Sequence, residues 1–319
     1  MQVVLLIIGF VIIIKASDLL VDASSALATR LRVPKMLIAL TIAAFGTCAP
    51  EIAISFQSVN AGNGEIAFAN VVGSCVVNVL LIIGLASFIK PIKIRHATIK
   101  KELPILVLIT SVFVILMLDS LFNPYTSDTF SRADGIVLLL LFGIFVVYLI
   151  QLFSKRTDVS QEELDKVSYT PFWAIFTIVV SIICIIYSSD IIVSMAEDIA
   201  LRLHISEKVI TMFVIVIGTS LPEMVMTVTS AKKGEFDIAI GNIIGTNIFN
   251  ICIVLGLPVI IYGNVLLTGF GIIDIIMVFL SSALLFFFAR SEKTIDKKEA
   301  IIMLALFAIY YIFLLVEGY

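Results

Sequence analysis

Two six-residue segments, Gly46–Glu51 and Gly218–Glu223, place a glutamate directly after a proline in the middle of an apolar stretch. Proline has no N–H and clashes with the carbonyl four residues back, so each helix should break there and free the carbonyl of Gly46 or Gly218. At membrane depth, a broken helix is tolerated only where it is buried or lines a cavity. Freed carbonyls, threonine hydroxyls and glutamate carboxylates are the hard oxygen ligands that Ca²⁺ and Na⁺ prefer. The segments therefore predict a cation site inside a bilayer.

The next apolar stretch in each half carries a polar stripe with a spacing of four residues, which puts its members on one helix face. The stripes are Asn70, Ser74 and Asn78, and Asn242, Thr246 and Asn250. We expect the last two members of each stripe to line the site. The first asparagine is left open between lining the site and hydrogen bonding to a neighbouring helix. Gly73 and Gly245 beside the stripes would let another helix approach closely.

The composition requires lipid as the solvent for most of the exterior. The chain has 319 residues, of which 61% are hydrophobic and only 14% are charged, whereas a soluble domain carries roughly a quarter charged residues. The net charge of −3 gives no reason to expect a nucleic-acid partner. The four cysteines lie in apolar segments without a C-x-x-C spacing, so neither a disulfide framework nor a zinc site is expected.

Ten apolar stretches are long enough to cross the hydrocarbon core, which takes about 20 helical residues. They lie near 2–26, 36–59, 66–89, 103–121, 135–153, 171–193, 209–231, 238–262, 267–289 and 300–316. We therefore predict an all-α membrane protein with ten transmembrane helices. Residues 1–153 and 169–319 form two halves of five spans each, and residues 154–168 form a polar linker too short for a soluble domain.

The basic residues predict the orientation of the chain. Of the 21 lysines and arginines, 17 fall in one set of alternate loops, at 27–35, 90–102, 154–168, 232–235 and 290–299. By the positive-inside rule these loops are cytoplasmic. Both termini are then extracellular in a multi-pass protein of the cell membrane.

The two halves are related by an internal repeat. A shift of 172 residues aligns 17–85 with 189–257 without a gap, with 20 identities in 69 positions. Most identities are glycine, proline, polar or acidic residues, so general apolar similarity does not explain them. Because each half has five spans, the second half must insert upside down. Inverted repeats with a site near the bilayer midplane are typical of secondary transporters.

The aligned aspartates Asp18 and Asp190 differ in their local sequence. Lys15 precedes Asp18 by three residues, which predicts an ion pair within one helix. At the position equivalent to Lys15 the second half has Tyr187, so Asp190 has no such partner and its role is left open.

The two G-T-x-x-P-E segments, with A-N-V-V-G-S at Ala69–Ser74 and G-N-I-I-G-T at Gly241–Thr246, resemble the α-repeats of sodium/calcium exchangers. These exchangers belong to the cation/Ca²⁺ exchanger superfamily, and the resemblance is to their compact prokaryotic form over the whole chain. It implies that Glu51 and Glu223 ligate Ca²⁺ and share in binding Na⁺. The further ligands that it implies are the hydroxyls of Thr47, Ser74, Thr219, Ser220 and Thr246, the main-chain oxygens of Ala44 and Val216, and the midpoint pair Asn78 and Asn250.

The chain departs from the family pattern at two places. Cys48 stands where the family usually has a serine that helps to ligate Na⁺, and sulfur is a poor ligand for Na⁺. Asn78 and Asn250 occupy both midpoint positions, where members often have at least one aspartate. Two formal negative charges then match one Ca²⁺ better than several Na⁺. The proton-coupled branch usually has G-N-x-x-E in place of G-T-x-x-P-E, which favours Na⁺ coupling here.

We therefore predict an antiporter that exchanges Ca²⁺ for Na⁺ by alternating access, without a cofactor. The first and sixth spans are the expected moving elements. Exchange of H⁺ for Ca²⁺ or for another divalent cation remains the alternative. An intramembrane enzyme would need a nucleophile and base, and no histidine lies at membrane depth. A channel would give ohmic current where an exchanger gives saturable counterflow. The oligomeric state is left open.

Overall fold

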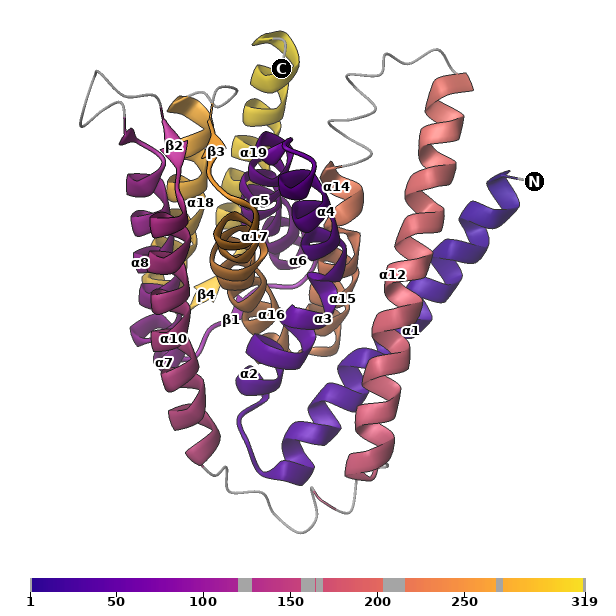
Figure 1. Cartoon of the computed structure of the whole chain (residues 1–319). Coiled ribbons are helices and arrows are strands. Elements are labelled where there is room, and N and C mark those ends of the chain that lie inside the picture. Colours follow the sequence, from indigo (N-terminus) through magenta and orange to yellow (C-terminus); the bar gives the residue numbers. More distant parts are fainter. Residues whose placement is uncertain are drawn as a thin grey trace.

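The computed structural model describes residues 2–119, 128–155, 164, 169–202, 216–267 and 272–317. The described chain is almost entirely helical (Figure 1). The elements of the first half are α1 (Gln2–Leu31), α2 (Lys35–Ile38), the π-helix η1 (Ala39–Ala43), α3 (Ala44–Thr47), α4 (Ala49–Asn60), α5 (Gly64–Val76), the π-helix η2 (Val77–Ile83), α6 (Gly84–Ile89), β1 (Ile92–Lys93), α7 (His96–Lys100), α8 (Glu102–Leu116), β2 (Thr129–Phe130) and α10 (Arg132–Ser154).

The second half repeats much of this order. Its elements are α12 (Pro171–Arg202), α14 (Val216–Thr219), α15 (Leu221–Lys233), α16 (Phe236–Phe249), the π-helix η4 (Asn250–Leu255), α17 (Gly256–Tyr262), β3 (Val265–Leu266), α18 (Ile272–Ser291), β4 (Thr294–Ile295) and α19 (Lys297–Glu317).

A helix lies at each of the ten predicted span positions, and six of the described helices are long and apolar enough to cross a membrane. Lys35–Thr47 and Ala49–Asn60 make a seventh if the pair, bent by 49°, is one span. Three positions are not among these spans: α1, α8, which has 15 residues, and the predicted span 209–231, much of which lies outside the described residues. The helical membrane fold is confirmed, whereas the count of ten spans stays a prediction.

Two continuous apolar spans form the centre of the molecule. One runs through α5, η2 and α6, the other through α16, η4 and α17, and most of their side chains are buried. By contrast, α10 exposes large hydrophobic side chains such as Leu140 and Ile144 along its length, as expected for a helix that faces lipid. The central spans carry the two polar stripes, so the fold surrounds these stripes with protein.

Two short strand pairs join the two halves in the way expected for an inverted repeat. Strand β1 of the first half pairs antiparallel with β4 of the second, and β2 pairs antiparallel with β3. In each pair, one strand follows the third span of its half and the other precedes the fifth span of the opposite half. The β2–β3 pair lies at the upper end of the molecule and the β1–β4 pair lies well below it (Figure 1). Such an exchange between opposite ends is what an inverted repeat requires.

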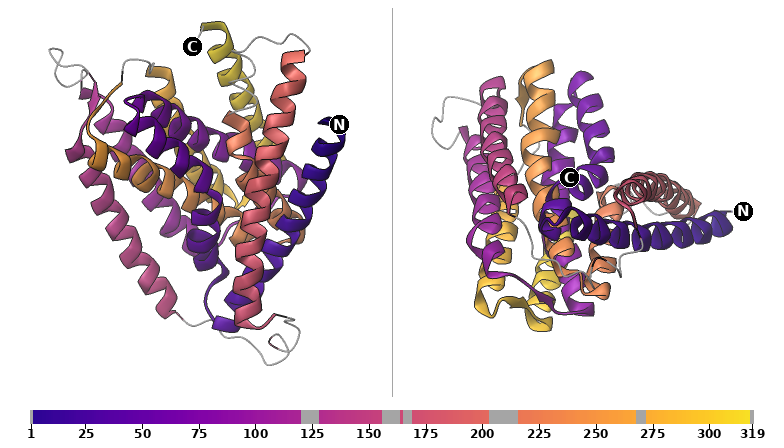
Figure 2. Two further views of the ribbon diagram at one scale, coloured as in Figure 1. Left: turned by 45° about the vertical axis from the view of Figure 1, so that its right-hand side comes forward. Right: turned by 90° about the horizontal axis from the view of Figure 1, so that it is seen from below.

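Helices α1 and α12 lie side by side along one edge of the molecule (Figures 1 and 2). Each is long, with 30 and 32 residues respectively. They contact each other over most of their length and contact the remaining helices chiefly through α2, α3, α14 and α15. These are the first and sixth predicted spans, and their outer faces expose apolar side chains such as Ile7 and Phe176.

The end of the molecule that carries the loop between α15 and α16 is held by ion pairs. Lys35 contacts Glu235 at 2.7 Å, and Lys233 contacts Asp22 at 2.7 Å and Asp18 at 3.5 Å. The predicted ion pair between Lys15 and Asp18 is therefore wrong, because Asp18 pairs with a lysine 215 positions further along the chain. This pairing fastens α1 to the end of α15.

Candidate functional site

The first Pro-Glu segment forms the predicted break. Helix α3 ends at Thr47, Cys48 has φ −73° and ψ 0°, and α4 begins at Ala49 with Pro50 in its first turn. The two helices meet at an angle of 49°. Because Pro50 has no N–H, the carbonyl of Gly46 lacks the donor that a continuous helix would supply.

The second Pro-Glu segment has the same backbone. Helix α14 ends at Thr219, Ser220 has φ −88° and ψ 9°, and α15 begins at Leu221 with Pro222 in its first turn. The repeat in sequence is therefore a repeat in local structure. In each segment the glutamate lies in the first turn of the second helix, where the positive end of the helix dipole stabilises a carboxylate.

Glu51 and Glu223 are both fully buried, with 0% of either residue exposed. None of their four carboxylate oxygens has a hydrogen-bond partner among the described residues. The two carboxylates are close enough to repel each other. A buried charge without a partner costs several kcal/mol unless a proton or a counter-ion neutralises it. Two such groups side by side form an acidic centre that is complete only when protons or cations neutralise it.

Unpartnered oxygens of the predicted ligand set are buried in the same part of the molecule. They are Ser74 Oγ, Asn78 Oδ1, Ser220 Oγ, Thr246 Oγ1 and Asn250 Oδ1, and none is hydrogen-bonded to a described residue. Buried polar groups in proteins are nearly always hydrogen-bonded, so each of these requires an explanation. No group of three His, Cys, Asp or Glu side chains comes together within the described ranges. A cation held here would therefore need hydroxyl and amide oxygens in addition to the two carboxylates.

Three predicted site residues of the first segment, in contrast, contact other groups: they are Thr47, Ala44 and Cys48. The Thr47 hydroxyl lies beside the Glu223 carboxyl but outside hydrogen-bond geometry, and donates instead to Ala44 O at 3.3 Å. Ala44 O also accepts from Cys48 N at 3.1 Å. In this conformation, Ala44 O, the predicted main-chain ligand, therefore already accepts two hydrogen bonds. The Cys48 thiol is buried beside both glutamates and lies 4.0 Å from Thr246 O.

Asn247 is a residue of the site region that the sequence analysis missed. Its Oδ1 accepts from Asn78 Nδ2 at 2.9 Å, and its Nδ2 donates to Cys75 O at 3.4 Å. This bond fixes the amide of Asn78 so that Oδ1, the atom able to bind a cation, remains without a described partner. The repeat equivalent of Asn247 is Cys75, so the alignment of the halves gave no signal for it.

The remaining predicted residues are placed as follows. Val216 and Thr219 are the first and last residues of α14, and the side chain of Val216 lies outside the described part. Asn242 donates to Thr227 Oγ1 at 3.3 Å, which is a helix-to-helix role, while its Oδ1 has no described partner. Asn70 Nδ2 has none either. For these two asparagines, both readings stay open.

Helix α16 approaches the first segment closely at its glycines. A Cβ on Gly245 would lie 2.7 Å from Ala44 Cβ and 3.0 Å from Leu40 Cα, and a Cβ on Gly241 would lie 2.7 Å from Ala39 Cβ. The predicted close approach at Gly245 is confirmed. It brings the stripe of the second half against the broken helix of the first.

Comparison with known proteins identifies the family. The sequence profile described as "Sodium/calcium exchanger protein" matches residues 1–151 and 173–316. The chain belongs to this family. Its match covers nearly the whole of both halves, so the resemblance carried by the two Pro-Glu segments extends to the complete chain.

Similar exchangers are known from bacteria and archaea. The putative antiporter CaxA of Alkalimonas amylolytica is 34% identical over 316 residues, 96% of each chain. The sodium/calcium exchanger MaX1 of Methanosarcina acetivorans is 29% identical over 290 residues, 81% of this chain and 82% of its own. A structure of the sodium-calcium exchanger NCX_Mj soaked with Na⁺ and Sr²⁺ superposes with a TM-score of 0.82 at 26% identity, and covers 97% of both chains.

These matches make the chain a multi-pass membrane exchanger of the cation/Ca²⁺ type, a transporter and not an enzyme. The acidic centre described above lies at its middle, where the two halves meet.

Proposed function

We propose that this exchanger moves Ca²⁺ in exchange for Na⁺ across the cell membrane, by alternating access to one site between the two Pro-Glu segments. The ligands are Glu51 and Glu223, the hydroxyls of Thr47, Ser74, Thr219, Ser220 and Thr246, the amide oxygens of Asn78 and Asn250, and the main-chain oxygens of Ala44 and Val216. The observation that carries the proposal is the cluster of buried, unpartnered oxygens around two buried carboxylates. Bound cations would neutralise the carboxylates and give these oxygens the partners that they lack among the described residues.

Charge determines how the ions compete. The centre holds two carboxylates and no aspartate at the stripe midpoints, which are Asn78 and Asn250. One Ca²⁺ neutralises two carboxylates, and so do two Na⁺. Because both ions need the same two groups, one ion can leave only when the other takes its place, which is the condition for coupled exchange.

The inverted halves supply the two states that alternating access requires. We take residues 1–153 and 169–319 as the halves and 154–168 as a cytoplasmic linker, with both termini extracellular. Helices α1 and α12 are the moving elements, because they contact each other far more than they contact the central spans.

The test is Ca²⁺ uptake into proteoliposomes loaded with Na⁺, for the wild type, Glu51→Gln and Glu223→Gln. Each glutamine keeps the shape of the side chain but removes a charge, so uptake should fall to the level of protein-free liposomes. Glu292→Gln is the matched control, since Glu292 is exposed and should leave uptake unchanged. Correct folding is checked by size-exclusion chromatography in detergent. Full uptake by either site variant would contradict the site.

Proton coupling is the second candidate, because protons would also neutralise two buried carboxylates, and Cys48 removes one oxygen from the Na⁺ ligands. The same liposomes distinguish the two. Uptake driven by a Na⁺ gradient at equal pH supports sodium exchange, and uptake driven only by a pH gradient supports proton exchange.

A further inference from the structure

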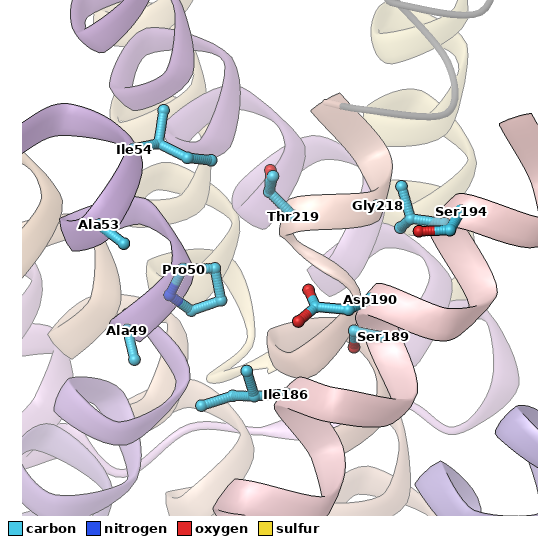
Figure 3. Close-up of a pocket in the computed structure, with 11 residues that line it drawn as sticks. Ala49, Pro50, Ala53, Ile54, Ile186, Ser189, Asp190, Ser194, Gly218 and Thr219 are labelled. Carbon is cyan, nitrogen blue, oxygen red and sulfur yellow. The ribbon is translucent and has the colours of Figure 1, made fainter. Parts of the chain in front are cut away.

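A cavity of about 460 Å³ lies between α4, α12 and α14. Its walls include Ala49, Pro50, Ser189, Asp190, Gly218 and Thr219 (Figure 3). Pro50 precedes Glu51, and Thr219 lies four residues before Glu223, so the cavity reaches both Pro-Glu segments from one side of the membrane. In the proposed orientation, that side is the external one.

Among the described residues, Asp190 is the one acidic side chain that lines this cavity. Its carboxylate points toward Pro50 and Thr219 across the cavity (Figure 3). It makes no ion pair or hydrogen bond with any residue that the structure describes. The neighbouring Ser189 is 3% exposed, and its hydroxyl, also without a described partner, lines the same cavity. An uncompensated carboxylate and a buried, unpartnered hydroxyl thus lie together outside the acidic centre.

The inverted repeat provides an internal comparison for Asp190. Its equivalent Asp18 lies at the opposite end of the molecule, where Lys233 contacts both Asp18 and Asp22. The position equivalent to Lys233 is Ala61, which carries no charge. The hydroxyl of Ser17, the equivalent of Ser189, donates to Val225 O at 3.1 Å. Asp18 and Ser17 thus have partners, whereas Asp190 and Ser189 have none among the described residues.

We propose that Asp190, with the Ser189 hydroxyl beside it, forms an outer station for hydrated cations on the external path to Glu51 and Glu223. The inference rests on the proposed function and adds a recruiting site to it. Ca²⁺ takes six to eight oxygen ligands, so one carboxylate and one hydroxyl are too few to replace its bound waters. The cavity leaves room for the ion to keep its waters. The station therefore raises the local concentration of cations, as charged clefts do, and does not compete with the buried centre for tight binding.

The station acts from one side of the membrane, so the test compares right-side-out with inside-out membrane vesicles. In each we would measure the KM and maximal rate of Na⁺-driven Ca²⁺ transport for the wild type, Asp190→Asn and Asp190→Glu. Asp190→Asn should raise the KM for external Ca²⁺ by about tenfold at low ionic strength, in the range of electrostatic steering. The KM for cytoplasmic Ca²⁺ and the maximal rate should stay unchanged, and Asp190→Glu should restore the low external KM.

Two further readouts separate recruitment from a structural effect. The difference between the wild type and Asp190→Asn should shrink as choline chloride is added, because salt screens a partly exposed charge. Glu292→Gln removes an exposed carboxylate that does not line this cavity, so it is the matched control and should leave the external KM unchanged. The proposed station would be contradicted by any of three results for Asp190→Asn. These are an unchanged KM for external Ca²⁺, equal changes of KM on the two sides of the membrane, or a change in the external KM that does not depend on salt. If the wild type itself shows no Na⁺-driven Ca²⁺ transport, the proposed function fails, and the assignment of the station to Ca²⁺ fails with it.

Discussion

Cys48 and Ser220 occupy the same place in the two halves, between the helix that ends in threonine and the helix that begins with the Pro-Glu pair. The Ser220 hydroxyl is a hard oxygen without a described partner, whereas the Cys48 thiol is soft and lies 4.0 Å from Thr246 O. Since Na⁺ prefers oxygen to sulfur, the two halves of the site should differ in their affinity for Na⁺.

Replacing Cys48 by serine should therefore strengthen Na⁺ binding. The Cys48→Ser variant supplies one more oxygen beside Glu51, and we expect the Na⁺ concentration for half-maximal exchange to fall by about fivefold, the effect of about one hydrogen-bond-sized interaction. The KM for Ca²⁺ should change less, because the carboxylates dominate Ca²⁺ binding. Titration of Na⁺ in the proteoliposome assay measures both values.

Cys252→Ser is the control for this substitution. Cys252 is also fully buried, but it lies in η4 and is not among the predicted ligands. If Cys48→Ser and Cys252→Ser changed the Na⁺ concentration for half-maximal exchange equally, or if Cys48→Ser did not change it, a role for the thiol in the sodium site would be contradicted.

Individual residues differ in how well the sequence predicts them. The burial of Glu51 and Glu223 at the two helix breaks was predictable, because an acid in an apolar stretch is costly and the motif occurs twice, whereas their role as ligands stays a prediction. Asn247 was not, because its partner in the repeat is Cys75 and the alignment showed no common residue. The pairing of Lys233 with Asp18 was not predictable either, because a local rule favoured Lys15 and the true partner lies on another helix.

At the scale of elements, the decisive contact is that of α16 with η1 and α3. Gly241 and Gly245 allow the backbones to approach until a Cβ would lie 2.7 Å from Ala39 or Ala44. The contact holds Thr246 against the break at Cys48, as shown by the thiol's approach to Thr246 O. The packing of these helices therefore fixes the distance between Cys48 and Thr246 in the proposed site.

A side chain at Gly245 should therefore damage both stability and transport. In Gly245→Val, the new atoms would meet the backbone of Leu40 at about 3 Å, and overpacking of this kind costs about 1–3 kcal/mol. We expect a lower midpoint of thermal unfolding in detergent, and a lower maximal rate of Ca²⁺ exchange in liposomes. Gly143→Val is the matched control, because nothing lies within 4 Å of a Cβ on Gly143. Equal losses in the two variants would contradict the role of the close contact.

The sequence predicts the types of the elements better than their details. The prolines predicted both breaks, and the apolar runs predicted where helices lie. The runs of apolar residues did not predict that α1 extends to Leu31 or α12 to Arg202, because charged residues at helix ends lie outside an apolar window. The π-helical turns at Val77–Ile83 and Asn250–Leu255 had no signal in composition. Asn78 and Asn250 lie within these turns, which agrees with the frequent occurrence of such turns at functional sites.

At the scale of the whole molecule, the pair α1–α12 is held to the rest unequally at its two ends. At one end, Lys233 contacts Asp18 and Asp22, and Ser17 donates to Val225 O. At the other, a cavity of about 460 Å³ separates α12 from α4. The conformation is therefore closed at the end with the ion pairs and more open at the end with Asp190. Movement of the pair to the opposite state requires the Lys233 contacts to separate.

Cross-linking at this contact should arrest exchange. Asp22 and Lys233 lie 2.7 Å apart through their charged groups, so a short, cleavable thiol cross-linker should join the cysteines of the double variant Asp22→Cys/Lys233→Cys. We expect Ca²⁺ uptake to fall to the background of protein-free liposomes after cross-linking and to recover when dithiothreitol cleaves the linker, because α1 can no longer move relative to α15. Both single-cysteine variants and the double variant carry Cys184→Ser, because Cys184 is only partly buried. Each single-cysteine variant, treated in the same way, should keep its uptake, since the native Cys48, Cys75 and Cys252 are buried. Full uptake by the cross-linked double variant would show that exchange proceeds without separation of this contact, and would contradict α1 as a moving element.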